Sequence, residues 1–116
     1  MAFHSFEDLE VWKRGCRLTV FVSERLDGSR EYWLLDQMRR AALSIPSNIA
    51  EGSEKTPKDF RRFLLIAAGS AAELRTQAYI AGPLGVLDKE GQSHVVDETK
   101  QLARVIRSLR QSIPDE

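Results

Sequence analysis

The sequence contains a single cysteine and no run of apolar residues long enough to cross a membrane. A lone Cys16 cannot form a disulfide within the chain, and a membrane-spanning helix would need about 20 consecutive apolar residues. The first ten residues are acidic and lack the basic and then apolar order of a signal peptide. We therefore expect a cytoplasmic protein with no membrane association.

The chain also lacks an excess of charge of either sign. Its 17 Lys and Arg residues balance 17 Asp and Glu residues, so no overall field attracts nucleic acid or anionic lipid. Hydrophobic residues make up 42% and charged residues 29% of the 116 residues, which is the composition of an ordinary folded protein. This length and composition predict one domain over residues 1–116.

Patterns that carry catalysis or metal binding are missing as well. Cys16, His4 and His94 lie far apart in the sequence, without the spacing of a zinc site or a nucleophile motif. No glycine-rich phosphate loop is present either. The sequence therefore predicts no enzyme activity, no cofactor and no metal, and Cys16 is expected to fill a small space in the core.

Apolar residues recur at three- and four-residue spacing in four stretches, which predicts an all-α fold. Each stretch is closed by glycine or proline, and some begin with a capping residue such as Thr56. Connections of only a few residues favour an antiparallel up-down-up-down four-helix bundle. The expected helices cover about residues 5–26, 30–52, 56–81 and 88–113.

Pro46 lies inside the second predicted helix, where it removes a backbone hydrogen bond and clashes with the preceding turn. Because the apolar spacing continues from Leu34 to Ile49, we expect one helix kinked at Pro46 and not two helices. The Asn48 amide is expected to donate to the carbonyl that the proline leaves free. Gly52 is expected to end this helix.

The first predicted helix has an apolar stripe that is expected to face the core. Its members are Phe6, Leu9, Trp12, Cys16, Leu18, Phe21 and Val22.

The second and third predicted helices each carry a mixed polar flank beside the apolar stripe. A helical hairpin would bring Arg40 of one flank near Glu73 of the other. One interpretation is a solvated face, and the alternative is a subunit contact in which polar side chains must find partners. The residues of this candidate polar seam are Gln37, Arg40, Ser44, Asn48, Glu51, Ser70, Glu73 and Gln77.

The fourth predicted helix has acidic residues early and basic residues late. This order complements the helix dipole, but it also makes a basic stripe that could contact phosphates. A smaller cluster between Lys55 and Arg62 is interleaved with acidic residues. The candidate nucleic-acid contacts are Lys100, Arg104, Arg107 and Arg110.

Residues 37–52, which read QMRRAALSIPSNIAEG, strongly resemble the signature of a family of four-helix-bundle proteins encoded in intervening sequences of bacterial 23S rRNA genes. The pattern Phe6-x-x-Leu9-x-Val11-Trp12 resembles the opening of that family, and residues 60–77 resemble its third helix. From Asp88 onward the likeness lies in the hydrophobic pattern more than in identity. The resemblance covers nearly the whole chain.

The resemblance implies an antiparallel four-helix subunit, a homopentamer and no established enzymatic activity. A related branch, the accessory variability proteins of diversity-generating retroelements, binds nucleic acid and a reverse transcriptase. RNA or a nucleic-acid-processing protein is therefore an expected partner, although those relatives are basic and this chain is neutral. Two interpretations stay open: an oligomeric nucleic-acid or ribonucleoprotein accessory factor, and a protein-binding scaffold with no nucleic-acid role.

Overall fold

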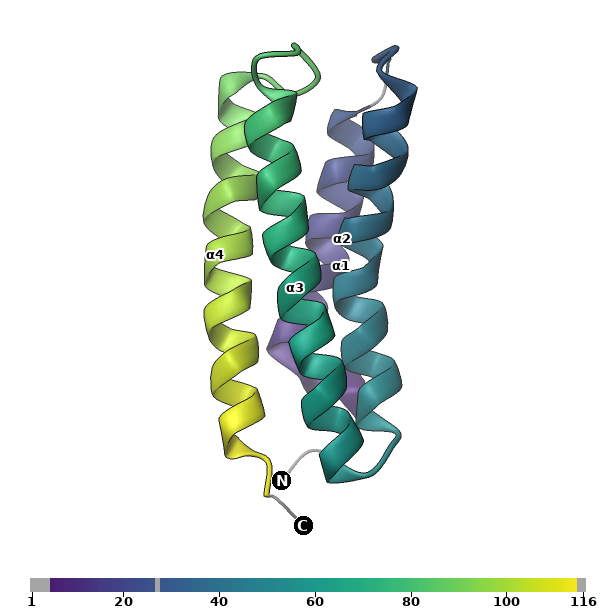
Figure 1. The fold of residues 1–116 in the computed structure, drawn as a ribbon, viewed down its shortest axis with the longest axis vertical. Coiled ribbons are helices and arrows are strands. Elements are labelled where there is room, and N and C mark those ends of the chain that lie inside the picture. Colours follow the sequence, from purple (N-terminus) through teal and green to yellow (C-terminus); the bar gives the residue numbers. More distant parts are fainter. Residues whose placement is uncertain (1–4, 27, 115–116) are drawn as a thin grey trace.

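The computed structural model describes residues 5–26 and 28–114. Over these residues the secondary structure is helical, without a strand, and the four α-helices lie side by side along the long axis of a rod of 46 × 20 × 18 Å (Figure 1). The all-α prediction with four helices is confirmed. The elements are a 3₁₀ turn, η1 (Phe6–Asp8), and the helices α1 (Glu10–Arg25), α2 (Tyr32–Ser53), α3 (Pro57–Ala81) and α4 (Lys89–Ser112).

Local capping signals set where α3 and α4 begin. The Thr56 hydroxyl accepts a hydrogen bond from the backbone N–H of Asp59 at 3.3 Å, and Pro57 occupies the first helical position. Asp88 caps α4 in the same way, because its carboxylate accepts from the backbone N–H of Gly91 at 2.7 Å. Both helices therefore begin where the sequence predicts.

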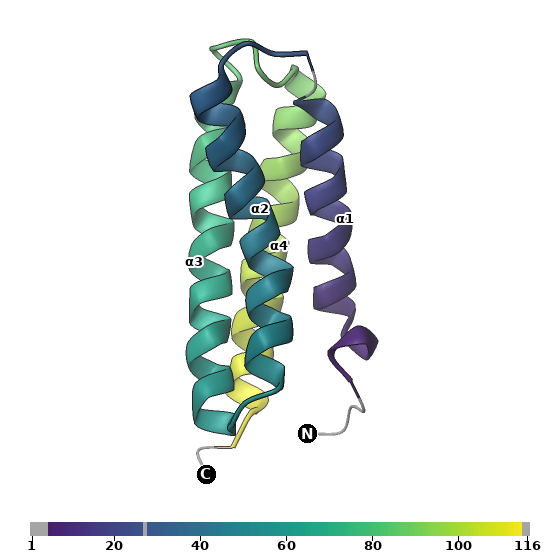
Figure 2. The same cartoon turned by 90° about the vertical axis from the view of Figure 1, so that its right-hand side faces the viewer.

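The first predicted helix is not continuous, which corrects the expectation of one helix from Ser5 onward. Ser5 caps only the turn η1, and Leu9 adopts an extended conformation with φ −78° and ψ 120° before α1 begins. Figure 2 shows η1 as a separate short coil at the end of α1. The break brings the Phe6 ring against Trp12 in an edge-to-face contact with ring centroids 5.2 Å apart.

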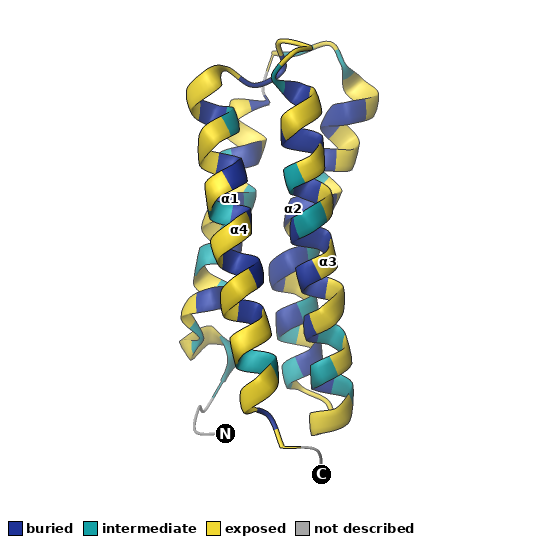
Figure 3. Cartoon of the chain, turned by 60° about the vertical axis from the view of Figure 1, so that its left-hand side comes forward, coloured by how far each residue is buried: buried dark blue, intermediate teal, exposed yellow. Residues whose placement is uncertain are grey.

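The core stripe of α1 also differs from the prediction. Trp12, Cys16 and Phe21 are only half-buried, while Gly15 is buried against α2. A Cβ on Gly15 would lie 3.2 Å from Pro46 Cδ, so glycine allows α1 to approach the proline closely. The buried residues of α1 are Val11, Gly15, Leu18 and Val22, and Figure 3 shows the buried positions along the inner side of the helices.

Gly52 does not end α2, which continues to Ser53. It is buried, and a Cβ there would lie only 2.6 Å from Phe63 Cβ. Glycine is needed at this position because α2 and α3 approach closely beside their connection. Further along α3, Ala67, Ala71, Ala78 and Ala81 are fully buried, and such small side chains allow neighbouring helices to approach closely.

Pro46 lies inside an unbroken α2, and the bend expected there stays a prediction. The carbonyl that the proline leaves without a donor belongs to Ala42, four residues earlier. Thr19 of α1 donates to that carbonyl at 3.1 Å. The expectation that Asn48 would donate to this carbonyl is therefore wrong. The Asn48 amide donates instead to the Ser44 carbonyl at 2.8 Å.

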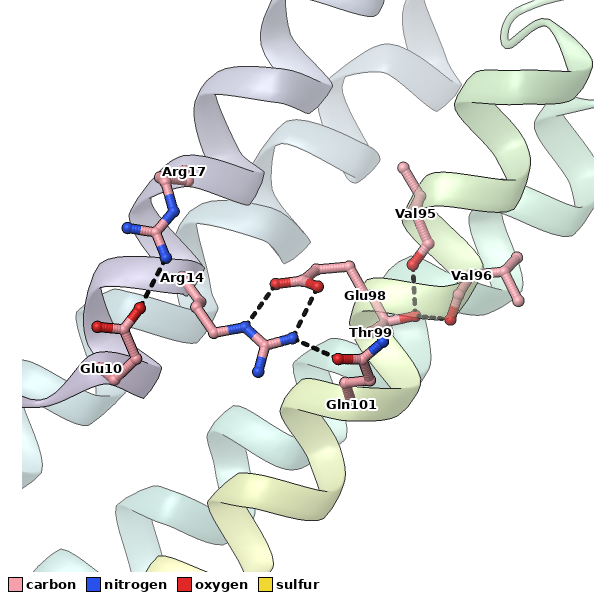
Figure 4. A network of polar contacts seen from close by, with 8 residues as sticks. All are labelled: Glu10, Arg14, Arg17, Val95, Val96, Glu98, Thr99 and Gln101. Carbon is pink, nitrogen blue, oxygen red and sulfur yellow. Dashed lines mark hydrogen bonds and ion pairs between the residues drawn. The ribbon is translucent and has the colours of Figure 1, made fainter.

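Charged side chains join α1 to α4. The Arg14 guanidinium donates to both carboxylate oxygens of Glu98, at 2.8 and 2.9 Å, and to Gln101 Oε1 at 2.9 Å (Figure 4). This hydrogen bonding raises the pKa of Arg14 above its ordinary value. The two charge-assisted hydrogen bonds to one carboxylate fix the position of α1 relative to α4.

None of the helices in the described part of the chain combines the length and the apolar character that a membrane span requires.

Candidate nucleic-acid interface

Basic side chains of α3 and α4 surround a hollow on the outside of the bundle. Lys100, Arg104 and Arg107 reach it from α4, and Arg75 reaches it from α3. The hollow has a volume of about 380 Å³ and is also lined by small or polar residues of α4. We call this hollow, together with the four cations that line it, the basic groove.

The three α4 members share one side of the helix because they follow spacings of four and three residues. Leu102 and Ile106 occupy the opposite, buried side of α4 and hold it in the core. Figure 3 shows exposed residues recurring along the outer side of α4. The fold therefore presents these three side chains in a row that runs along the bundle axis.

Among the described residues, no acidic side chain forms an ion pair with the cations of the basic groove. In residues 5–26 and 28–114, none of its four cations forms an ion pair or a side-chain hydrogen bond. Glu98, the acid two residues before Lys100, turns toward α1 and pairs with Arg14. A phosphate entering the groove would thus meet cations that have no other partner.

Arg110, the fourth residue of the predicted stripe, lies apart from the other three. It is about 80° around the helix from Lys100, on the side toward α3. Its Nε donates to the backbone carbonyl of Arg61 at 3.2 Å. Arg110 therefore has a structural contact in addition to its charge.

A second basic hollow of about 230 Å³ surrounds Arg110. Within it Arg62 lies 3.7 Å from the carboxylate of Asp59, and the Arg61 guanidinium donates to the Pro114 carbonyl. These contacts neutralise part of its charge. Its lining residues are Lys58, Asp59, Arg61, Arg62, Leu65 and Arg110.

Arg75 is the residue of the basic groove that the sequence analysis missed. Its position on α3 becomes informative only when the flank of α3 that faces α4 is known. Arg75 is three residues before Ala78, whose carbonyl accepts a hydrogen bond from Gln92 of α4 at 3.1 Å. Arg75 could have been identified only by first aligning α3 with α4 and asking which α3 residues lie beside the basic residues of α4.

The candidate polar seam is brought together only in its centre. The Ser44 and Ser70 hydroxyls lie 2.7 Å apart, and Asn48 Nδ2 donates to Ser44 Oγ at 2.8 Å. Within the described residues, Arg40 and Glu73 are both exposed and form no ion pair with each other. The remaining seam residues divide by burial: Gln37 and Glu51 are exposed and Gln77 is buried.

Gln77 carries an unusual feature of the seam. Its side-chain oxygen is buried and has no hydrogen-bond partner among the described residues. Buried polar atoms normally have a partner. On the same flank of α3, Ile66 and Ile80 keep 42% and 43% of their surface exposed, so this flank combines an unpaired acceptor with exposed apolar side chains.

Neither Cys16 nor His94 is among the residues that line the basic groove. Cys16 is half-buried on α1, and burial raises the pKa of its thiol. The His94 ring packs on Phe21 with centroids 4.2 Å apart, and His4 lies outside the described residues. Among the residues that the structure describes, no group of three or more His, Cys, Asp and Glu side chains is placed to hold a metal ion.

Over the described residues the fold is that of an all-α protein with four α-helices. Residues 7–108 match the family of the 23S rRNA-intervening sequence protein, and the chain belongs to this family. It is similar to a crystal structure of a protein of unknown function from the S23 ribosomal protein family of Bacteroides thetaiotaomicron VPI-5482. The TM-score is 0.81 at 19% identity, over 88% of this chain and 99% of that one, which shows a shared fold. No curated protein sequence matches this chain.

Proposed function

We propose that this protein is a non-enzymatic, homo-oligomeric accessory factor of the cytoplasm that binds RNA through the basic groove. The observation that carries the proposal is the convergence of Arg75, Lys100, Arg104 and Arg107 from two helices around one hollow. Contacts between such cations and phosphates supply most of the sequence-independent affinity for nucleic acid. Binding is therefore electrostatic and weakly selective for sequence.

We infer that the subunit that presents this groove is an antiparallel up-down-up-down bundle. The contact of Ala78 with Gln92 lies beside the connection between α3 and α4, and the contact of Arg61 with Arg110 lies at their far ends. This order of contacts supports opposite directions for the two helices. Antiparallel packing is what places Arg75 beside the basic row of α4.

A homo-oligomer, with the pentamer that the family resemblance implies, is the second part of the proposal. The outer flanks of α2 and α3 support it, because Gln77 has a buried acceptor without a donor and Ile66 and Ile80 are exposed beside it. A neighbouring subunit could supply the donor and cover the apolar surface. Repetition of the basic groove around a closed ring would raise the effective concentration of cations for one RNA strand.

The decisive experiment is a filter-binding titration with RNA at low salt. The double variant Arg104→Glu/Arg107→Glu is expected to lose most of the affinity of the wild type. Lys13→Glu/Arg30→Glu changes the net charge equally at exposed positions outside the groove and serves as the matched control. Equal binding by both variants and the wild type, all shown to be folded oligomers, would rule out the groove.

A protein-binding scaffold is the alternative function. It is favoured by the large apolar side chains that α2 exposes in the single subunit, among them Trp33 and Leu43. The kinship that we propose with the accessory variability proteins would make a nucleic-acid-processing protein the partner. Failure of the groove variants to change RNA binding would place this alternative first.

A further inference from the structure

We propose that the basic groove takes single-stranded nucleic acid and that Tyr79 is the surface on which one of its bases stacks. This inference rests on the proposed RNA binding and adds the class of substrate. It depends on the position of Tyr79 beside the groove, on its exposure, and on the straight course of the cations.

Tyr79 follows Arg75 by one turn of α3, so the two side chains share a side of the helix. Its neighbours Ala78 and Ala81 face the core, which directs Tyr79 outward. The tyrosine therefore extends the lining of the basic groove in the direction of the connection between α3 and α4. A strand whose phosphates contact Arg75 would bring a neighbouring base to the level of Tyr79.

The Tyr79 side chain is 53% exposed. In the described part of the chain, neither its ring nor its hydroxyl has a partner. A large aromatic surface is thus free beside a row of unpaired cations. Single-strand binding proteins combine these two elements, because cations track the backbone while aromatic side chains stack with bases of any sequence.

The course of the groove favours a single strand over a duplex. Lys100, Arg104 and Arg107 rise along α4 by about 1.5 Å per residue, in a line parallel to the helix axis. A flexible strand can follow that line, whereas each backbone of a duplex winds away from it. The bases of a duplex are also stacked on each other and, except at its ends, offer no face to Tyr79.

The test uses fluorescence anisotropy with three probes: a labelled single-stranded RNA, a hairpin duplex with the same number of phosphates, and inorganic polyphosphate as a polyanion without bases, added as competitor. The full-length oligomer is expected to prefer the single strand. Tyr79→Ala should weaken single-strand binding about tenfold and leave the salt slope and the competition by polyphosphate unchanged. Tyr79→Phe should bind as the wild type does.

Arg75→Gln is the matched variant for the phosphate contact. It should lower the salt slope by about 0.7 for a single strand, which Tyr79→Ala should not do. Salt-dependent binding in which Tyr79→Ala equals the wild type would overturn the stacking role while the proposed function stands. Loss of the oligomer in Tyr79→Ala would assign Tyr79 to a subunit contact and also overturn it. Binding of no probe by the wild type would overturn the proposed function together with this inference.

Discussion

The hydroxyl of Thr19 on α1 donates a hydrogen bond to the carbonyl of Ala42 on α2. Pro46 has no N–H to offer this carbonyl, so the donor comes from a neighbouring helix. The same hydroxyl lies 2.8 Å from the Gly15 carbonyl, and its single hydrogen is shared between the two acceptors. Gly15 and Thr19, one turn apart on α1, therefore accommodate the ring and the missing donor of the same proline.

Thr19→Val is expected to lower the free energy of unfolding by about 1 to 2 kcal/mol. Valine keeps the shape of threonine but leaves the Ala42 carbonyl without a donor in the contact between α1 and α2. Thr19→Ser, which retains the hydroxyl, is the control and should stay closer to the wild type. Urea denaturation of the three proteins measures the difference, and equal stabilities would show that water replaces Thr19.

Gly52→Ala should destabilise the bundle by about 1 to 3 kcal/mol. The added Cβ would clash with Phe63 Cβ, and neither atom is the end of a flexible side chain. Gly69→Ala is the matched control, since a Cβ at that exposed helical position would have no atom within 4 Å beyond its chain neighbours and the adjacent backbone of its own helix. It should raise stability by up to about 1 kcal/mol through helix propensity. Similar effects of both substitutions on the thermal midpoint would contradict the packing argument.

Arg14 and Glu98 should show a coupling free energy of about 0.5 to 1 kcal/mol in a double-mutant cycle with Arg14→Met and Glu98→Gln. Their side chains are only 21% and 19% exposed, and the pair has two hydrogen bonds. Arg17 and Glu10, at 64% and 67% exposure, form the control pair (Figure 4). Denaturant unfolding in low salt should give almost no coupling for the control, and equal coupling for both pairs would contradict the role of burial.

Cys16 should react slowly with a thiol reagent in the folded protein. Burial raises the pKa of its thiol, and the charge of Arg17 opposes this only in part. Folding therefore keeps the proton on Cys16 at pH values where the unfolded chain already forms thiolate. The contribution of Cys16 to the free energy of unfolding therefore falls as the pH rises above the ordinary thiol pKa. Modification rates with and without urea between pH 7 and 9, in the range given by the ordinary thiol pKa, test the sign.

Light scattering behind a sizing column should give the mass of several subunits at micromolar concentration. Ile66→Glu/Ile80→Glu is expected to reduce that mass, because it places charge on the exposed apolar flank of α3. Val20→Glu/Val105→Glu adds the same charge at exposed apolar positions of α1 and α4 and should leave the oligomer intact. A monomeric wild type would rule out the proposed assembly.

The helices were predictable because their signals are local. Thr56 with Pro57 and Asp88 begin their helices by contacts within one turn, and the apolar spacing can be read without knowledge of any neighbour. The break at Leu9 was not predictable in this way, since it accompanies a ring contact between Phe6 and Trp12.

The sequence pattern did not predict which small residues pack in the core. It also did not predict all of the cations that line the basic groove. Hydrophobic periodicity does not count Gly15 as a core residue, although the close approach of Pro46 makes it one. The α4 row could be recognised from its spacing, but Arg75 joins it only through the pairing of α3 with α4. The contact of Arg110 with the Arg61 carbonyl likewise depends on that pairing.

The hydrogen bond from Thr19 of α1 to the Ala42 carbonyl of α2 also couples the unfolding of the two helices. If α1 opened while the other helices stayed folded, the Ala42 carbonyl and the surface of Pro46 would lose their partner at the same moment. Partial opening of that kind is therefore disfavoured by more than the loss of apolar contact. Pro46 of α2 thus raises the free energy of states in which α1 is detached. We therefore expect the amide hydrogens of α1 and α2 to exchange with solvent as one unit.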